Sequence, residues 1–207
     1  AGKEVRTQIE RPSREIVFVD AGVENYQQFV DDVQNNADDN RNIEVVVLDR
    51  DKDGIEQISS FLQDQNDVDA IHIISHGNAG SVNLGDSVLD YEALVANAKT
   101  IQGWGNAFTD DGDLLIYGCN LAAGADGRAF IGTLGDLTGT DVAASIDLTG
   151  ASSEGGDWDL EYRTGIVEAN VAFSAEAQQQ FAAVLAPPVV TVDPLITNDT
   201  TPQLTGT

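Results

Sequence analysis

Short runs of aliphatic residues, apolar on both faces, recur along this chain and alternate with segments of helical periodicity. A strand that is apolar on both faces must be covered on both sides, which favours a parallel sheet between two helical layers. We therefore predict an α/β fold, a three-layer sandwich with a mostly parallel central sheet. The expected strands are EIVFVDAG (15–22), IEVVVLD (43–49), DAIHIISHG (69–77), DLLIYGC (113–119) and DVAASID (141–147).

Between these strands, apolar residues recur at intervals of three and four, the period of an amphipathic helix. Helices are expected over 23–39, 54–65, 91–104, 124–139 and 174–185. Two further segments, 81–90 and 158–169, alternate like hairpins, the second turning at Thr164-Gly165.

These elements place one α/β domain at residues 15–186. An extended leader (1–14) precedes it and holds four of the ten basic residues. Pro187-Pro188 then opens a segment rich in Pro, Thr and Val. We interpret residues 187–207 as a linker followed by the start of a bacterial Ig-like repeat, which makes the chain part of a larger protein.

The charge balance narrows the classes of partner. With 35 acidic and 10 basic residues, the formal net charge is −25. Such a field repels phosphate backbones and anionic lipid, so we expect no nucleic-acid partner. No apolar stretch is long enough for membrane insertion. The acidic, cysteine-poor composition is typical of exported bacterial surface proteins, so we expect a secreted or cell-surface location, and a monomer.

The chain has a single cysteine, which excludes an internal disulfide and leaves one thiol for chemistry. Cys119 ends one apolar run, and His76 follows an earlier one. If the two runs are neighbouring parallel strands, the thiol and the imidazole emerge side by side at one edge of the sheet. That is the arrangement of a cysteine nucleophile with a histidine acid–base partner. Taken separately, each residue is more simply explained as part of the core.

The glycines beside these residues have a use in the same chemistry. Gly77 would allow its backbone N–H to approach a substrate, and Gly118 would free the turn before the nucleophile. We predict that the N–H groups of Gly77 and Cys119 form an oxyanion hole. We also expect the N-terminus of the following helix to lower the pKa of the Cys119 thiol. His72, earlier on the same strand, is interpreted as structural.

The segments HIISHG and LLIYGC together resemble the caspase-like (clan CD) cysteine peptidases, which include caspases, gingipains, clostripain and toxin autoprocessing domains. More closely, a wider set of segments resembles an uncharacterised domain near the N-terminus of giant bacterial adhesins with Ig-like, cadherin-like or calcium-binding repeats. That set is VFVDAG, VVVLD, HIISHG, GDLLIYGCNLA and GGDWDLE, and it extends over about 15–186.

The resemblance implies a caspase-like fold with His76 and Cys119 as the catalytic dyad. It also implies cleavage of the parent chain or of a neighbouring surface protein. In caspase-like peptidases the strand after the cysteine helix shapes the S1 pocket, which makes Ser145 and Asp147 candidate substrate-binding residues. Asp147 would favour a basic P1 residue, although a turn carboxylate is the simpler explanation. Trp158 either lines a substrate cleft or packs in the core.

Two kinds of self-cleavage site remain open. One is the basic leader, at Arg6, Arg11 or Arg14; the other is Leu185-Ala186, since toxin autoprocessors cleave after leucine. A polyanionic activator is disfavoured because basic residues are few.

Metal and cofactor signals are weak. DRDKDG (49–54) has the opening spacing of a calcium loop, but Ser60 stands where the bidentate glutamate belongs, so a capped turn is favoured. We assign no metal ligands and no cofactor, with calcium as the one structural or activating ion that the acidic composition suits. The alternatives to an endopeptidase are a non-catalytic caspase-fold module for surface retention or partner binding, and a calcium-stabilised scaffold unit.

Overall fold

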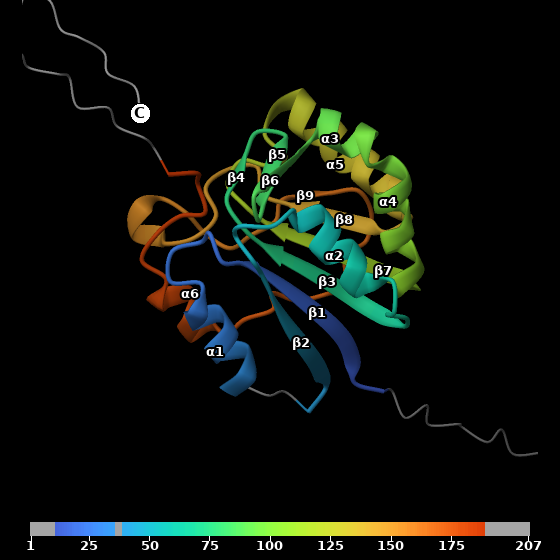
Figure 1. Ribbon diagram of the computed structural model, residues 1–207. Coiled ribbons are helices and arrows are strands. Elements are labelled where there is room, and N and C mark those ends of the chain that lie inside the picture. The colour runs from blue at the N-terminus through green and yellow to red at the C-terminus, as the bar shows by residue number, and fades with distance from the viewer. Residues whose placement is uncertain (1–10, 36–38, 189–207) are drawn as a thin grey trace, which may run out of the picture.

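In the computed structural model, the described residues are 11–35 and 39–188. Within them, a central sheet has the strand order β2-β1-β3-β7-β8-β9 (Figure 1). Its strands are β1 (Ser13–Asp20), β2 (Arg41–Leu48), β3 (Val68–Ile74), β7 (Phe108–Tyr117), β8 (Asp141–Ala144) and β9 (Tyr162–Arg163). All neighbours pair in parallel except β8 and β9. The predicted, mostly parallel sheet is confirmed.

Helices cover both faces of this sheet, as its apolar strands require. One face packs against α2 (Gly54–Leu62), α3 (Tyr91–Ala96), α4 (Ala98–Gln102) and α5 (Gly124–Thr138). The other face packs against α1 (Gln27–Asn35) and α6 (Ala175–Gln180), which lie side by side in Figure 1. The fold is therefore the three-layer α/β sandwich that the sequence predicts.

A small second sheet lies next to the end of β3. It contains β4 (Gly77–Asn78), β5 (Ser81–Leu84) and β6 (Ser87–Asp90), paired antiparallel in that order. The hairpin expected at 81–90 is confirmed. Two short 3-10 helices, η1 (Gly103–Ala107) and η2 (Ser152–Glu154), complete the described elements.

The hairpin expected over 158–169 is wrong. Only Tyr162–Arg163 form a strand, and it pairs with β8 rather than with a neighbour in the sequence. Two aspartates, one at the start of β8 and one within β7, accept hydrogen bonds from backbone N–H groups of residues 166–169. Asp141 accepts from Ile166 N, and Asp113 accepts from Glu168 N and Ala169 N. A second strand is not needed to satisfy this backbone.

The last predicted helix is shorter than expected. It ends at Gln180 rather than at residue 185, and Phe181 has an extended backbone. At the start of the domain, β1 begins at Ser13, so the last residues of the predicted leader belong to the sheet. Most of the predicted linker and Ig-like segment lies outside the described residues. No helix among the described residues is long and apolar enough to cross a membrane.

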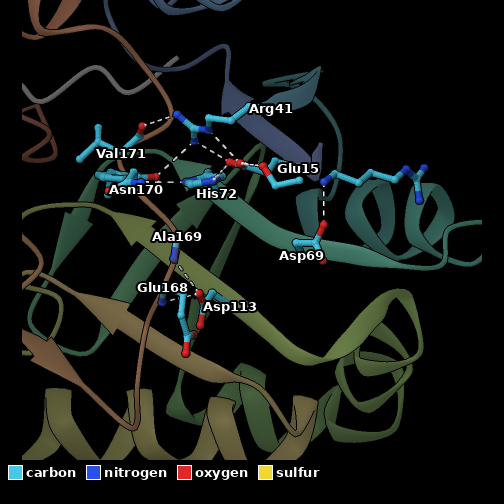
Figure 2. Close-up of polar contacts among 12 residues, drawn as sticks. Glu15, Arg41, Asp69, His72, Asp113, Glu168, Ala169, Asn170 and Val171 are labelled. Carbon is cyan, nitrogen blue, oxygen red and sulfur yellow. Dashed lines mark hydrogen bonds and ion pairs between the residues drawn. The ribbon is translucent and has the colours of Figure 1, made fainter. Parts of the chain in front are cut away.

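A buried polar network fastens the amino-terminal ends of the strands (Figure 2). Glu15, on β1, accepts hydrogen bonds from Arg41 Nε and Nη2 at 2.8 and 2.6 Å and contacts His72 Nε2 at 3.0 Å. Arg41 also donates to the carbonyl oxygens of Asn170 and Val171. These bonds join β1, β2 and β3 to the segment that contains residues 170 and 171. His72 is fully buried, which supports its interpretation as structural.

The environment fixes the charge states in this network. Burial would raise the pKa of Glu15, but hydrogen bonds from Arg41, His72 and Ser13 outweigh it and lower the pKa well below its ordinary value. Burial lowers the pKa of His72, against the opposing hydrogen bond to Glu15. The arrangement is therefore a carboxylate that accepts from a guanidinium and from a neutral imidazole.

We expect Glu15→Gln to lower the free energy of unfolding by about 3 kcal/mol at neutral pH, because it leaves the Arg41 charge without its buried partner. The folded-state pKa of Glu15 is lowered, so its contribution is present above its unfolded-state pKa of about 4.5 and is lost as the pH falls below it. Urea denaturation of both proteins between pH 7 and pH 3 should show the difference shrinking in acid. The control is Glu44→Gln, an exposed glutamate on β2, with a change within about 0.5 kcal/mol. Equal stability of Glu15→Gln and wild type at neutral pH would contradict the assignment.

Candidate active site

His76 and Cys119 follow two neighbouring parallel strands. The pairing of β3 with β7 ends at Ile74 and Tyr117, and Ser75 N then donates to the Tyr117 carbonyl at 3.1 Å. Both chains therefore leave the sheet in register at the same edge. We call this the carboxyl edge, where β3, β7 and β8 end. The structure places the two residues of the predicted dyad on adjacent chains there.

Beyond the strands, the two backbones approach more closely than side chains would allow. A Cβ atom on Gly77 would lie 2.8 Å from the Gly118 carbonyl carbon, and one on Gly118 would lie 3.1 Å from Gly77 Cα. A Cβ on Gly77 would overlap the Gly118 backbone, and one on Gly118 would require Gly77 to shift by a few tenths of an ångström. The glycines after the histidine and before the cysteine thus allow the two backbones to approach each other.

Polar contacts hold the His76 loop from two sides. The His76 carbonyl accepts from Asn83 N on β5 at 2.9 Å. Asp20, which ends β1 and is buried, accepts from Ser75 Oγ at 3.2 Å and from Gly85 N at 2.8 Å. His76 Nδ1 is buried and has no hydrogen-bond partner among the described residues. A buried nitrogen with an open position is suited to proton transfer with a reacting group.

The Cys119 side chain is fully buried against the backbone of Thr149. Its Sγ lies 3.3 Å from Thr149 N and 3.6 Å from Thr149 O. Burial raises the pKa of the thiol, and backbone hydrogen bonds from Thr149 and Leu185 oppose that rise only in part. The expectation of a lowered thiol pKa is therefore wrong: α5 begins at Gly124, too far along the chain to offset the loss of solvent.

The predicted oxyanion donors converge on one carbonyl group. Gly77 N donates to the Leu185 oxygen at 2.9 Å, and Cys119 N donates to the same oxygen at 3.3 Å. Two N–H groups on one carbonyl oxygen, one of them belonging to the cysteine, is the geometry by which acyl-transfer enzymes bind a reacting carbonyl. The group held there belongs to a residue 66 positions after the cysteine.

Residues 183–185 reach this position as a segment that pairs with residues 149–151. Gly150 and Val184 form an antiparallel bridge, Ala151 N donates to the Ala183 carbonyl at 2.8 Å, and Leu185 N donates to the Thr149 carbonyl at 2.8 Å. The Leu185 side chain is fully buried in the apolar cluster that contains Cys119. Peptide recognition by strand addition uses the same pattern, with main-chain hydrogen bonds and a pocket for alternate side chains.

A family model described as a domain of unknown function (DUF4347) matches residues 16–185. The chain belongs to the DUF4347 family. No curated protein matches it. The matched range begins inside β1 and ends at Leu185, so it includes both the sheet and the segment that reaches the oxyanion donors.

In the DUF4347 domain, α6 anchors residues 183–185. The N-cap residue Ser174 donates through Oγ to Asp32, on α1, which also accepts from Ser174 N at 2.7 Å. Phe181 packs on Phe29 and Trp158, with ring centroids 5.0 and 5.6 Å away. These contacts hold the chain at Ser174 and Phe181, just before residues 183–185.

The three predicted substrate-binding residues occupy different surroundings. Ser145 is buried, and its Oγ donates to the carboxylate and the carbonyl of Asp147. Asp147 is exposed, in the loop after β8. Trp158 is largely buried in an aromatic cluster with Phe29 and Phe173, and its Nε1 lies 3.4 Å from the Gln178 carbonyl. Its contacts are therefore with α6 and with Phe181, the residue that follows α6.

Acidic side chains gather in one place near the site. Asp147, Asp157 and Glu161 are exposed, and one oxygen of each lies within 4.8 Å of the others. No ion is present there. The other calcium-like segment is a helix cap, as predicted: Asp53 accepts from Glu56 N at the start of α2.

A cavity of about 760 Å³ lies at the opposite edge of the sheet, near Glu15, Arg41 and Asp113. Glu15 and Arg41 belong to the buried network of Figure 2. Asp113 accepts from Glu168 N and Ala169 N through one carboxylate oxygen, and its other oxygen is buried with no hydrogen-bond partner among the described residues. At the carboxyl edge, Leu185 and Cys119 are both fully buried in one apolar cluster.

Sequence reasoning missed the residues that act through their backbone or through another residue. Thr149 lies two residues beyond the strand predicted at 141–147, and its contacts with Leu185 and Cys119 are made by its peptide group rather than its side chain. Asp20 and Ser75 position the histidine loop. A signal for Asp20 existed, since a carboxylate at the end of an apolar strand that becomes buried needs partners.

We expect Gly77→Ala to lower the free energy of unfolding by about 1–3 kcal/mol, because the new methyl group overlaps the Gly118 backbone. Gly132→Ala on α5 is the matched control: its Cβ has no atom within 4 Å, so it should be neutral or stabilising. Thermal denaturation of both variants checks the pair. A Gly77→Ala protein as stable as Gly132→Ala would contradict the close approach.

We expect Cys119 to react slowly with iodoacetamide, with a half-maximal rate above about pH 8.5, the ordinary thiol pKa. Burial favours the protonated thiol, so the reactive thiolate forms only at higher pH. Mass spectrometry of the alkylated protein measures the rate against pH, and the urea-unfolded chain, with the same single cysteine, is the control. A half-maximal rate near or below pH 7 in the folded protein would contradict the assignment.

Proposed function

We propose that this domain is a cysteine endopeptidase of caspase-like architecture, with Cys119 as nucleophile and His76 as acid–base partner. It processes a larger bacterial protein, secreted or at the cell surface, to which it belongs. The observation that carries the proposal is the carbonyl oxygen held by Gly77 N and Cys119 N. A peptide carbonyl in that place, beside the single thiol of the chain, is a substrate bound for acyl transfer.

Cys119, His76 and two backbone N–H groups each have a defined role in the proposed reaction. The Cys119 thiol transfers its proton to His76 Nδ1, and the sulfur attacks the carbonyl carbon. A carbon–sulfur bond forms, and the negative charge on oxygen is stabilised by the N–H groups of Gly77 and Cys119. The carbon–nitrogen bond then breaks as His76 returns the proton to the departing amine. Water hydrolyses the thioester, which releases the acid and restores the thiol.

The raised thiol pKa agrees with this order of events. A buried neutral thiol needs a base at the moment of attack, and the unpartnered nitrogen of His76 supplies one. No third residue is required when the imidazole passes a single proton from sulfur to nitrogen.

A second candidate function rests on the complete burial of the Cys119 side chain. A cysteine that is fully covered also suits a non-catalytic module for surface retention or partner binding. In that case Cys119 is a core residue, and its removal leaves the intact chain unchanged.

The deciding experiment follows the intact mass of the purified 207-residue protein over time. We expect wild type to produce fragments, Cys119→Ala to produce none, and His76→Ala to slow their appearance by about 10²-fold or more. Gly132→Ala, on α5 and with no atom within 4 Å of the new Cβ, serves as the control and should still produce fragments. Each run is made with and without calcium. Intact wild type in every condition would favour the non-catalytic module.

A further inference from the structure

We infer that the bond cleaved by this domain is its own Leu185–Ala186 bond, and that the site selects leucine at the residue before the cleaved bond. This inference rests on the proposed endopeptidase function and names its substrate. It starts from the identity of the carbonyl group between the two oxyanion donors, which is that of Leu185. The carbon that the thiol would attack is therefore the one joined to the nitrogen of Ala186.

Main-chain contacts set the register of the bound segment. Leu185 N donates to Thr149 O, which also lies 3.6 Å from Cys119 Sγ. The bridge between Val184 and Gly150 continues the pairing toward Ala183. A shift of one residue would point the leucine side chain away from its pocket, because alternate side chains face opposite sides of a strand. The register therefore selects one peptide bond.

The side chain before the bond is matched to an apolar pocket. Leu185 is fully buried within the cluster that includes Tyr117, Cys119 and Phe181. A charged side chain in its place would lose its hydration without gaining a partner there. Asp147, which would favour a basic residue, is exposed and accepts a hydrogen bond from Ser145 Oγ.

The described basic residues of the leader lie at the other end of the sheet. Arg11 forms an ion pair with Asp69 at 2.7 Å, and Arg14 N donates to the same carboxylate. Asp69 is near the start of β3, whereas His76 follows its end. At about 3.3 Å per residue, the strand separates them by roughly 20 Å. Cleavage after Arg11 or Arg14 within the same folded molecule would require this contact to open.

The test identifies the new chain ends of the wild-type protein by intact mass and by N-terminal sequencing. We expect one Cys119-dependent cut, with the shorter product beginning at Ala186. Leu185→Met should be cut at the same bond, and Leu185→Arg should be cut at least about 10²-fold more slowly. Arg11→Gln, at the opposite edge, should leave the cut unchanged. Circular dichroism shows whether each variant is folded, and the position of the wild-type cut does not depend on any variant.

The outcomes separate the two ideas. Cys119-dependent cleavage at another bond, or a folded Leu185→Arg protein cut as fast as wild type, would overturn the leucine assignment and leave the endopeptidase standing. Absence of any Cys119-dependent cut would overturn the endopeptidase, and the leucine assignment with it.

Discussion

The close approach of two backbones at the ends of β3 and β7 is the constraint on which the candidate site depends. Parallel pairing brings both chains to one edge in register, and glycine at positions 77 and 118 removes the Cβ atoms that would separate them. Their N–H groups can then point at a single oxygen. A side chain on Gly77 would overlap the Gly118 backbone and displace one of the two donors, so the geometry of the candidate site requires glycine at position 77.

The two edges of the sheet have different roles. At the amino-terminal edge, buried charge is paired: Glu15 accepts from Arg41 and His72, and these bonds join three strands to the crossing segment. Breaking such a buried pair is costly, which gives the frame its rigidity. At the carboxyl edge, within the described residues, His76 Nδ1 has no hydrogen-bond partner and the Cys119 thiol contacts the backbone of Thr149. Asp113 Oδ1, at the amino-terminal edge, is likewise buried with no partner among those residues.

The burial of Cys119 has a specific origin. The thiol is covered in part by residues 183–185, which return to the site after α6 has been fastened to α1 and to the aromatic cluster around Trp158. The cover is held by main-chain hydrogen bonds and one leucine side chain, the interactions by which an extended peptide substrate is recognised. The same burial raises the thiol pKa. Burial of Cys119 thus explains why its thiol favours the protonated form.

The fold class follows from the amino-acid sequence, which also predicts that His76 and Cys119 lie at one edge of the sheet. Strands apolar on both faces require two helical covers, and an apolar run ending in His-Gly or Gly-Cys places those groups at a sheet edge, because local periodicity and parallel topology decide both. The carbonyl group that accepts from Gly77 N and Cys119 N is placed there by long-range contacts, which the sequence pattern does not predict. The sequence predicted helix as far as residue 185, but the chain turns extended at Phe181, since long-range pairing with residues 149–151 outweighs local helical preference. The thiol pKa was likewise set by burial from distant residues, which no local pattern reveals.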